Sequence, residues 1–177
     1  MDFIIRKAAM ADRQNIQSLI AVSARELSRN DYSDVEIEAA LRAIFGVDSS
    51  LIEDGTYFVA EHDGQLIGCG GWSRRKTLFG GDQFSDRDTS ELNPETDAAR
   101  IRAFFIHPEF ARKGVARSIL ARCEAEAIEH GFRTLELMST LPGINFYEAC
   151  GYMRVQPTTL ELGDATIGFV VMRKAII

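Results

Sequence analysis

The sequence is poor in cysteine and has no long apolar run. Its three cysteines, Cys69, Cys123 and Cys150, are far apart in apolar surroundings, which predicts small buried thiols in a reducing cytoplasm. No apolar run approaches the ~20 residues needed to span a bilayer. The first six residues lack the basic and apolar regions of a signal peptide. We therefore expect a cytoplasmic protein with no membrane partner.

Strong positive charge and metal-ligand spacing are also missing. The net charge is -6 over 177 residues, which argues against binding of nucleic acid through its phosphates and is compatible with an amine substrate. Neither the cysteines nor the three histidines show zinc spacing, so we expect no metal site. The chain has no internal repeat, and its length fits a single domain over residues 1–177.

Apolar periodicity and turn residues predict an α/β protein with a mixed sheet. Strands are expected over 3–5, 56–61, 65–72, 99–106, 133–138, from 152, and 166–172. Helices are expected over 12–29, 36–45, 114–130 and 142–150. The unit from 99 to 138 implies two parallel strands with a right-handed crossover, and the flanking hairpins imply antiparallel pairing. Helices should cover both faces of this sheet.

Residues 73–98 do not fit this pattern. They are polar, rich in Gly, Asp, Ser and Thr, and show little periodicity. Long irregular segments inside a compact domain are usually functional or mobile loops. We expect this segment either to be poorly ordered or to lie over a site.

The most informative segment is the turn between the strand at 99–106 and the following helix. Residues 106–120 read IHPEFARKGVARSIL. Such a turn leaves backbone N–H groups free at a helix N-terminus, which is an anion site. Lys113 and Arg117 lie at the positive end of the helix dipole, an unfavourable position unless an anion lies between them. The turn is therefore predicted to bind phosphate.

Two common phosphate-binding loops do not match this turn. A P-loop requires glycine, four residues and then Gly-Lys-Ser/Thr, whereas here Lys113 precedes Gly114 and no magnesium-binding hydroxyl follows. The dinucleotide fingerprint requires three glycines after the first strand, whereas this turn has one glycine late in the chain. A nucleotide kinase and a dinucleotide-binding enzyme are therefore disfavoured.

The turn resembles the acyl-CoA-binding motif of the GNAT N-acyltransferases. Ile106, Pro108, Gly114, Ala116 and Leu120 match its fixed positions. Ala111 stands where that motif usually has Gln or Arg, although Arg112 is adjacent. A second match is NFYEACGY at residues 145–152, which resembles the family's aromatic-Tyr-x-x-x-Gly-aromatic signature. The resemblance implies the GNAT fold, with a six- to seven-stranded mixed sheet flanked by about four helices.

The resemblance also implies acetyl-CoA as co-substrate. The backbone N–H groups of 112–116 would hold its pyrophosphate, which Gly114 would allow to approach closely. The backbone of the preceding strand would pair with the pantetheine arm. The implied CoA-binding residues are Phe104, Phe105, Ile106, Arg112, Lys113, Gly114, Val115, Ala116, Arg117 and Asn145. For Asn145, a merely exposed position is an equal alternative.

The implied reaction is attack of an amine on the thioester carbonyl. Tyr147 in the second signature is implied as the acid that protonates the leaving thiolate, the alternative being an aromatic residue that only packs in a short helix. The general base is open, because the strand before the CoA turn contains no glutamate. Glu53, Glu61 and ordered water are candidates.

The acceptor pocket is predicted from Tyr32, Trp72, Arg102 and Ser139. Arg102, with Arg100, is suited to a substrate carboxylate, or it forms ordinary ion pairs. Ser139 would touch the acetyl group or the acceptor, or belong to a plain turn. Tyr32 and Trp72 would form pocket walls, although Trp72 also fits a half-buried sheet position.

Together these observations predict an acetyl-CoA-dependent N-acetyltransferase acting on a primary amine of a small molecule or protein. A homodimer is compatible with the resemblance. The alternative is a catalytically silent acyl-CoA-binding sensor or regulatory module, because no base is evident. The identity of the acceptor is left open.

Overall fold

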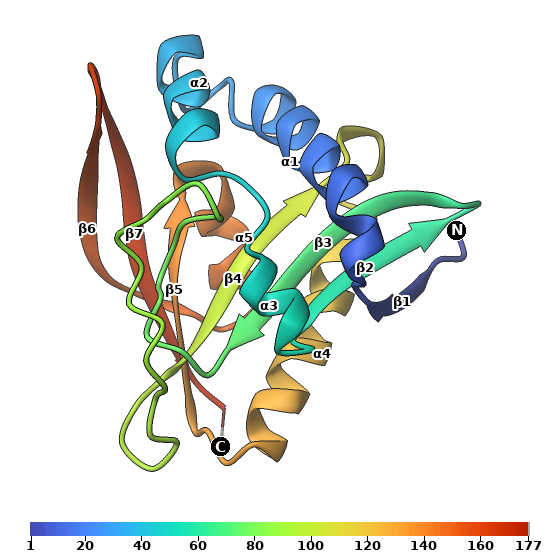
Figure 1. Ribbon diagram of the computed structural model, residues 1–177, viewed down its shortest axis with the longest axis vertical. Helices are drawn as coiled ribbons and strands as arrows, with labels where there is room; N and C mark the ends of the chain where they lie inside the picture. Colours follow the sequence, from blue (N-terminus) through green and yellow to red (C-terminus); the bar gives the residue numbers. More distant parts are fainter. Residues whose placement is uncertain (177) are drawn as a thin grey trace.

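The computed structural model describes residues 1–176 and contains one seven-stranded mixed sheet (Figure 1). The strands are β1 (Ile4–Lys7), β2 (Tyr57–His62), β3 (Gln65–Ser73), β4 (Ala99–Ile106), β5 (Thr134–Thr140), β6 (Met153–Leu162) and β7 (Ala165–Ala175). Their order in the sheet is β1-β2-β3-β4-β5-β7-β6. β4 and β5 are parallel, as their helical crossover requires, and the other neighbours are antiparallel.

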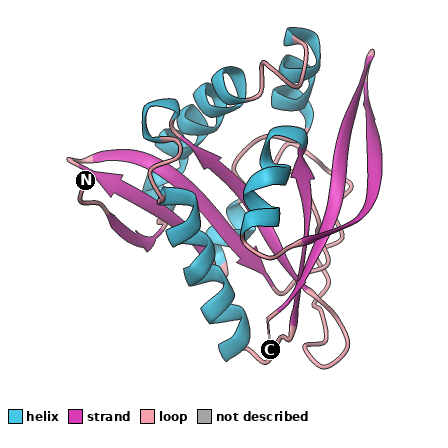
Figure 2. Ribbon diagram, turned by 180° about the vertical axis from the view of Figure 1, so that it is seen from behind, coloured by secondary structure: helices cyan, strands magenta, loops and turns pink. Residues whose placement is uncertain are grey.

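Helices cover both faces of the sheet (Figure 2). They are α1 (Arg13–Leu27), α2 (Asp34–Ala43), α3 (Ser49–Glu53), α4 (Val115–Glu129) and α5 (Ile144–Ala149). The first three pack on one face around buried Ile16, Ile20 and Leu51. α4 and α5 pack on the other face around Ile119 and Leu120. The sheet thus separates two apolar cores.

The sheet opens where β4 leaves β5. These strands pair only at Ala99–Leu135 and Arg100–Glu136, and β5 pairs with β7 along its whole length. Beyond that point β4 and β5 diverge (Figure 1). An irregularity in the β3–β4 register falls at Ala103, whose φ is 54°, and a bulge of this kind bends a strand. The last residues of β4 therefore have no strand beside them on the β5 side.

The predicted fold class and element types are confirmed. β4 has the predicted bounds, and Ser33 caps α2 by accepting the N–H of Glu36 at 3.1 Å. α3 was not predicted, because five residues are too few to show helical periodicity. None of the helices within residues 1–176 is long and apolar enough to cross a membrane.

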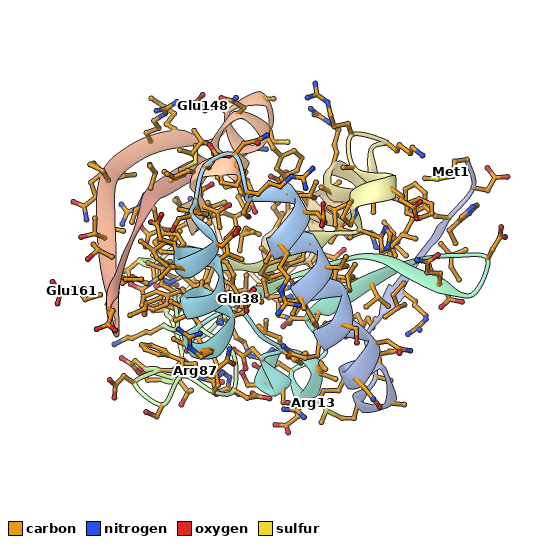
Figure 3. The ribbon with its side chains drawn as sticks, turned by 90° about the horizontal axis from the view of Figure 1, so that it is seen from above. Met1, Arg13, Glu38, Arg87, Glu148 and Glu161 are labelled. Carbon is orange, nitrogen blue, oxygen red and sulfur yellow. The ribbon has the colours of Figure 1, made fainter. Side chains whose placement is uncertain are left out.

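Ion pairs attach residues 74–98 to the body of the protein. Arg75 pairs with Asp54 at 2.7 Å, and Arg87 pairs with buried Asp48 at 2.7 Å. Asp82 lies between Arg13 at 2.8 Å and Arg87 at 3.7 Å, and Figure 3 shows these two arginines along the same edge of the molecule. The loop is therefore fastened at several separate points.

Candidate active site

A groove of about 730 Å³ lies beside the free end of β4. Its walls come from the end of β4, the turn before α4, the start of α5, and α1. Nine of the ten residues predicted to bind CoA line it: Phe104, Phe105, Ile106, Arg112, Gly114, Val115, Ala116, Arg117 and Asn145. Lys113 lies outside this lining, exposed, with its Nζ 5.3 Å from the ring centre of Phe110.

The turn before α4 presents free donors and free positive charge. The backbone N–H groups of 112–117 donate to no residue within 1–176. Arg112, Lys113 and Arg117 are exposed and form no ion pair with the described residues. A Cβ built on Gly114, whose φ is 86°, would meet nothing within 4 Å. Free N–H groups at a helix start, cationic side chains and open space are what a bound phosphate requires, so these residues fit CoA.

Sequence reasoning missed one polar contact in the groove. The buried hydroxyl of Ser23 in α1 accepts the backbone N–H of Ile106 at 3.1 Å. This N–H belongs to the strand end that was expected to pair with the pantetheine. Ser23 therefore competes with the pantetheine for the N–H of Ile106. No local signal in the sequence indicates this contact, because the two residues are 83 positions apart.

A second hollow of about 90 Å³ meets the groove at its inner end. The two share five lining residues, which are Phe45, Phe104, Phe105, Thr140 and Tyr147. Of these side chains, only those of Thr140 and Tyr147 carry a polar atom. The place where both hollows meet is therefore an apolar junction with two hydroxyl groups.

Tyr147 lies at this junction and is held by aromatic packing. Its ring centre is 6.4 Å from that of Phe104, 5.0 Å from Phe146 and 5.6 Å from Tyr152. Burial raises the pKa of its phenol well above the ordinary value of 10.0. No hydrogen bond joins this hydroxyl to another described residue. The phenol therefore keeps its proton and has donor capacity to spare.

Two of the four predicted acceptor residues, Arg102 and Ser139, line the smaller hollow. Arg102 is 3% exposed and donates from Nη2 to Asp48 at 3.1 Å and to the carbonyl of Gly80 at 2.7 Å. Ser139 donates to the carbonyl of Thr140 at 2.7 Å. Arg100 lies apart and pairs with Glu136 at 3.0 Å. Arg102 thus forms the ordinary ion pair that was one alternative and also lines the hollow, while its binding of a substrate carboxylate stays a prediction.

Tyr32 and Trp72, expected as walls of the acceptor pocket, line neither of the two hollows. Trp72 is fully buried, and its indole donates to Glu126 of α4 at 3.0 Å. The Tyr32 hydroxyl donates to the carbonyl of Gly168 at 2.6 Å and accepts the N–H of Leu141 at 2.9 Å. Burial raises the pKa of Tyr32 to about 12. Through these two hydrogen bonds Tyr32 connects β7 to the turn after β5.

Neither glutamate considered as a base is in position. Glu61 pairs with Arg6 at 3.1 Å in the outer part of the sheet, and Glu53 is exposed on α3. Neither lines either hollow. Within residues 1–176, no cluster of three or more His, Cys, Asp or Glu side chains is arranged to hold a metal ion.

The walls of the smaller hollow include residues that the sequence did not single out. Phe45 follows α2, while Leu78 and Phe79 come from the loop 74–98. The loop thus lies over the site, one of the two outcomes expected for it. Apolar residues inside a polar, irregular segment were the signal that could have identified Leu78 and Phe79.

A sheet that opens beside a turn with free N–H groups, with a tyrosine where two hollows meet, is the arrangement expected of the GNAT acyltransferases. The profile of the acetyltransferase (GNAT) family matches residues 21–152. The chain therefore belongs to the GNAT acetyltransferase family. None of the curated proteins matches it.

Solved structures show the same fold. A GCN5-related N-acetyltransferase from Rhodopseudomonas palustris is 17% identical with a TM-score of 0.72, covering 99% of this chain and 96% of that one. PaiA N-acetyltransferase from Thermoplasma acidophilum, in complex with coenzyme A, is 16% identical with a TM-score of 0.68 and 99% of both chains covered. YncA from Salmonella typhimurium, with acetyl-CoA, is 16% identical with a TM-score of 0.63, covering 99% and 94%.

Proposed function

We propose that this protein is an acetyl-CoA-dependent N-acetyltransferase that acts on a primary amine. The observation that carries the proposal is the position of Tyr147, which lines both the groove that fits CoA and the smaller hollow. A hydroxyl at that junction can donate to a group bound in the groove or to a group bound in the smaller hollow. The two PaiA and YncA structures with CoA and acetyl-CoA support the same ligand.

The residues of the groove have separable binding roles. The N–H groups of 112–116 and the cationic side chains of Arg112, Lys113 and Arg117 hold the phosphates. The end of β4, from Phe104 to Ile106, offers its backbone to the pantetheine, with Ser23 yielding or sharing the N–H of Ile106. Asn145 is exposed at the rim of the groove. Acetyl-CoA, when bound, supplies the thioester and its acyl group.

Tyr147 supplies the proton that the reaction needs. The acceptor nitrogen forms a bond to the acyl carbon, the carbon–sulfur bond breaks, and the phenol of Tyr147 donates its proton to the leaving sulfur. Water takes one proton from the ammonium form of the acceptor before attack and a second from the nitrogen as the amide forms, because no carboxylate or imidazole from residues 1–176 lines the smaller hollow. Water then returns a proton to Tyr147.

We also propose a cytoplasmic location. All three cysteines are free, and Cys69 and Cys123 are buried. Burial raises the pKa of both thiols, Cys69 to about 12, which suppresses the reactive thiolate. Free thiols persist in a reducing compartment.

Release of free thiol from acetyl-CoA across a panel of amines tests the proposed function. We expect at least one amine to accelerate thiol release and to yield an N-acetyl product detectable by mass spectrometry. Binding of CoA without acetylation of any amine would instead support the alternative function, a catalytically silent acyl-CoA sensor. Retention of Tyr147 at the junction of the two hollows favours the enzyme.

A further inference from the structure

The smaller hollow is lined by polar and apolar groups in similar measure and lacks negative side chains. Its apolar lining residues include Ile44, Phe45, Leu78, Phe79, Leu137 and Met138. No aspartate, glutamate or histidine from residues 1–176 lines it. Burial of a second cationic group requires an opposite charge nearby, so the hollow is a poor site for a polyamine or another polycation.

The charges behind the hollow add positive rather than negative potential. Arg102, which lines it, shares Asp48 with Arg87, whose Nη1 lies 2.7 Å from that carboxylate. Arg87 in turn approaches Asp82, which also pairs with Arg13. Three guanidinium groups therefore meet two carboxylates, and the excess charge is +1.

Arg102 also has donor capacity that its partners do not use. Its Nη2 is occupied by Asp48 and Gly80, and its Nη1 is 3.5 Å from the carbonyl of Thr77. Its Nε donates to no residue in the described part of the chain. A guanidinium has five N–H donors in a planar fork. Arg102 can therefore donate hydrogen bonds to a further anion while it stays paired with Asp48.

The volume limits the acceptor further. The hollow measures about 90 Å³, whereas an engineered apolar cavity that holds benzene measures about 150 Å³. The volume therefore favours a compact aliphatic group over an aromatic ring.

We propose that the acceptor is a short aliphatic α-amino acid, with its side group against the apolar residues of the smaller hollow and its carboxylate on Arg102. This inference rests on the proposed N-acetyltransferase activity. It names the acceptor class by three properties: one amine, one carboxylate and a small aliphatic group. Loop 74–98, through Leu78 and Phe79, then sets the size of that group.

Initial rates with four acceptors test the proposal: L-valine, L-valinamide, L-phenylalanine and spermidine. Rates are corrected for the neutral fraction of each amine, because valinamide is the weaker base. Loss of a hydrogen bond to a charged group predicts that kcat/KM for valine exceeds that for valinamide by about tenfold or more. Phenylalanine and spermidine should be poorer than valine.

Two variants separate a size effect from general damage. Phe79→Ala enlarges the hollow and should raise kcat/KM for phenylalanine relative to valine at least about tenfold, which a lost ring permits. Phe84→Ala is the matched control, because Phe84 packs on Phe79 at 5.1 Å between ring centres but does not line the hollow. It should leave the valine preference unchanged.

The outcomes are distinguishable. Equal rates with valine and valinamide, or a preference for spermidine or for a peptide beginning with valine, would overturn the acceptor class while acetyl transfer stands. Binding of acetyl-CoA without acetylation of any amine would overturn both the proposed function and this inference.

Discussion

Tyr147 is positioned by packing rather than by hydrogen bonds. Three aromatic rings surround it, and its hydroxyl has no partner among the described residues. A phenol fixed in this way can donate to a new partner without first breaking an existing bond. Its proposed role as an acid therefore depends on the hydroxyl, while its ring contributes to the core.

Removal of this hydroxyl should slow the reaction and leave CoA binding intact. Tyr147→Phe keeps the ring and its packing, so the protein should fold normally. Loss of a general acid predicts a fall in kcat of about 100- to 10,000-fold. Steady-state rates and calorimetric titration with CoA measure the two effects. Unchanged kcat would remove Tyr147 from the mechanism.

The pH dependence of the rate follows from the raised pKa of Tyr147. The acid form is the active one, and because its pKa lies above 10 in the folded protein, it persists across the assay range. We expect kcat/KM to rise with pH as the acceptor amine, an alkylammonium with a pKa of about 10.4, loses its proton, with no falling limb below about pH 10. A falling limb centred below pH 10 that is absent in Tyr147→Phe would contradict this account.

Two residues with a positive φ lie at the elements that border the groove. Gly114 begins α4 with a φ of 86°, and Ala103 bends β4 with a φ of 54°. The first presents free N–H groups, and the second accompanies the divergence of β4 from β5. Both are local conformations that side chains disfavour.

Gly114→Glu tests the turn. The new carboxylate enters open space where phosphate is expected, so CoA affinity should fall at least about 30-fold through lost charged hydrogen bonds. Gly163→Glu is a matched control, because Gly163 also has a positive φ of 63° and open space around it, at the tip of the β6–β7 hairpin. Calorimetry with both variants measures the difference. Equal affinities would contradict the assignment of the turn.

Ala103→Val tests the bend in β4. A branched side chain is strained at a φ of 54°, which predicts a loss of about 1–3 kcal/mol in the free energy of unfolding. Ala175→Val in β7, an exposed strand position, is the control and should change stability little. Urea denaturation compares them. Equal stabilities would show that the bend tolerates a branched residue.

At the scale of the whole molecule, sequence patterns predicted the sheet, its parallel pair and the position of the turn before α4. These features depend on local periodicity and on motifs within about fifteen residues. The acceptor side was predicted poorly. Trp72 faces α4 rather than the hollow, and Asp48 reaches Arg102 across 54 residues. Which face a residue takes, and which distant charge it meets, are set by tertiary packing.

The central claim is that the groove between β4 and α5 binds CoA. Calorimetric titration of the wild-type protein with CoA, and separately with ATP at the same concentrations, tests it most directly. The account predicts saturable binding of one CoA per chain and no binding of ATP. Binding of ATP without binding of CoA would contradict it.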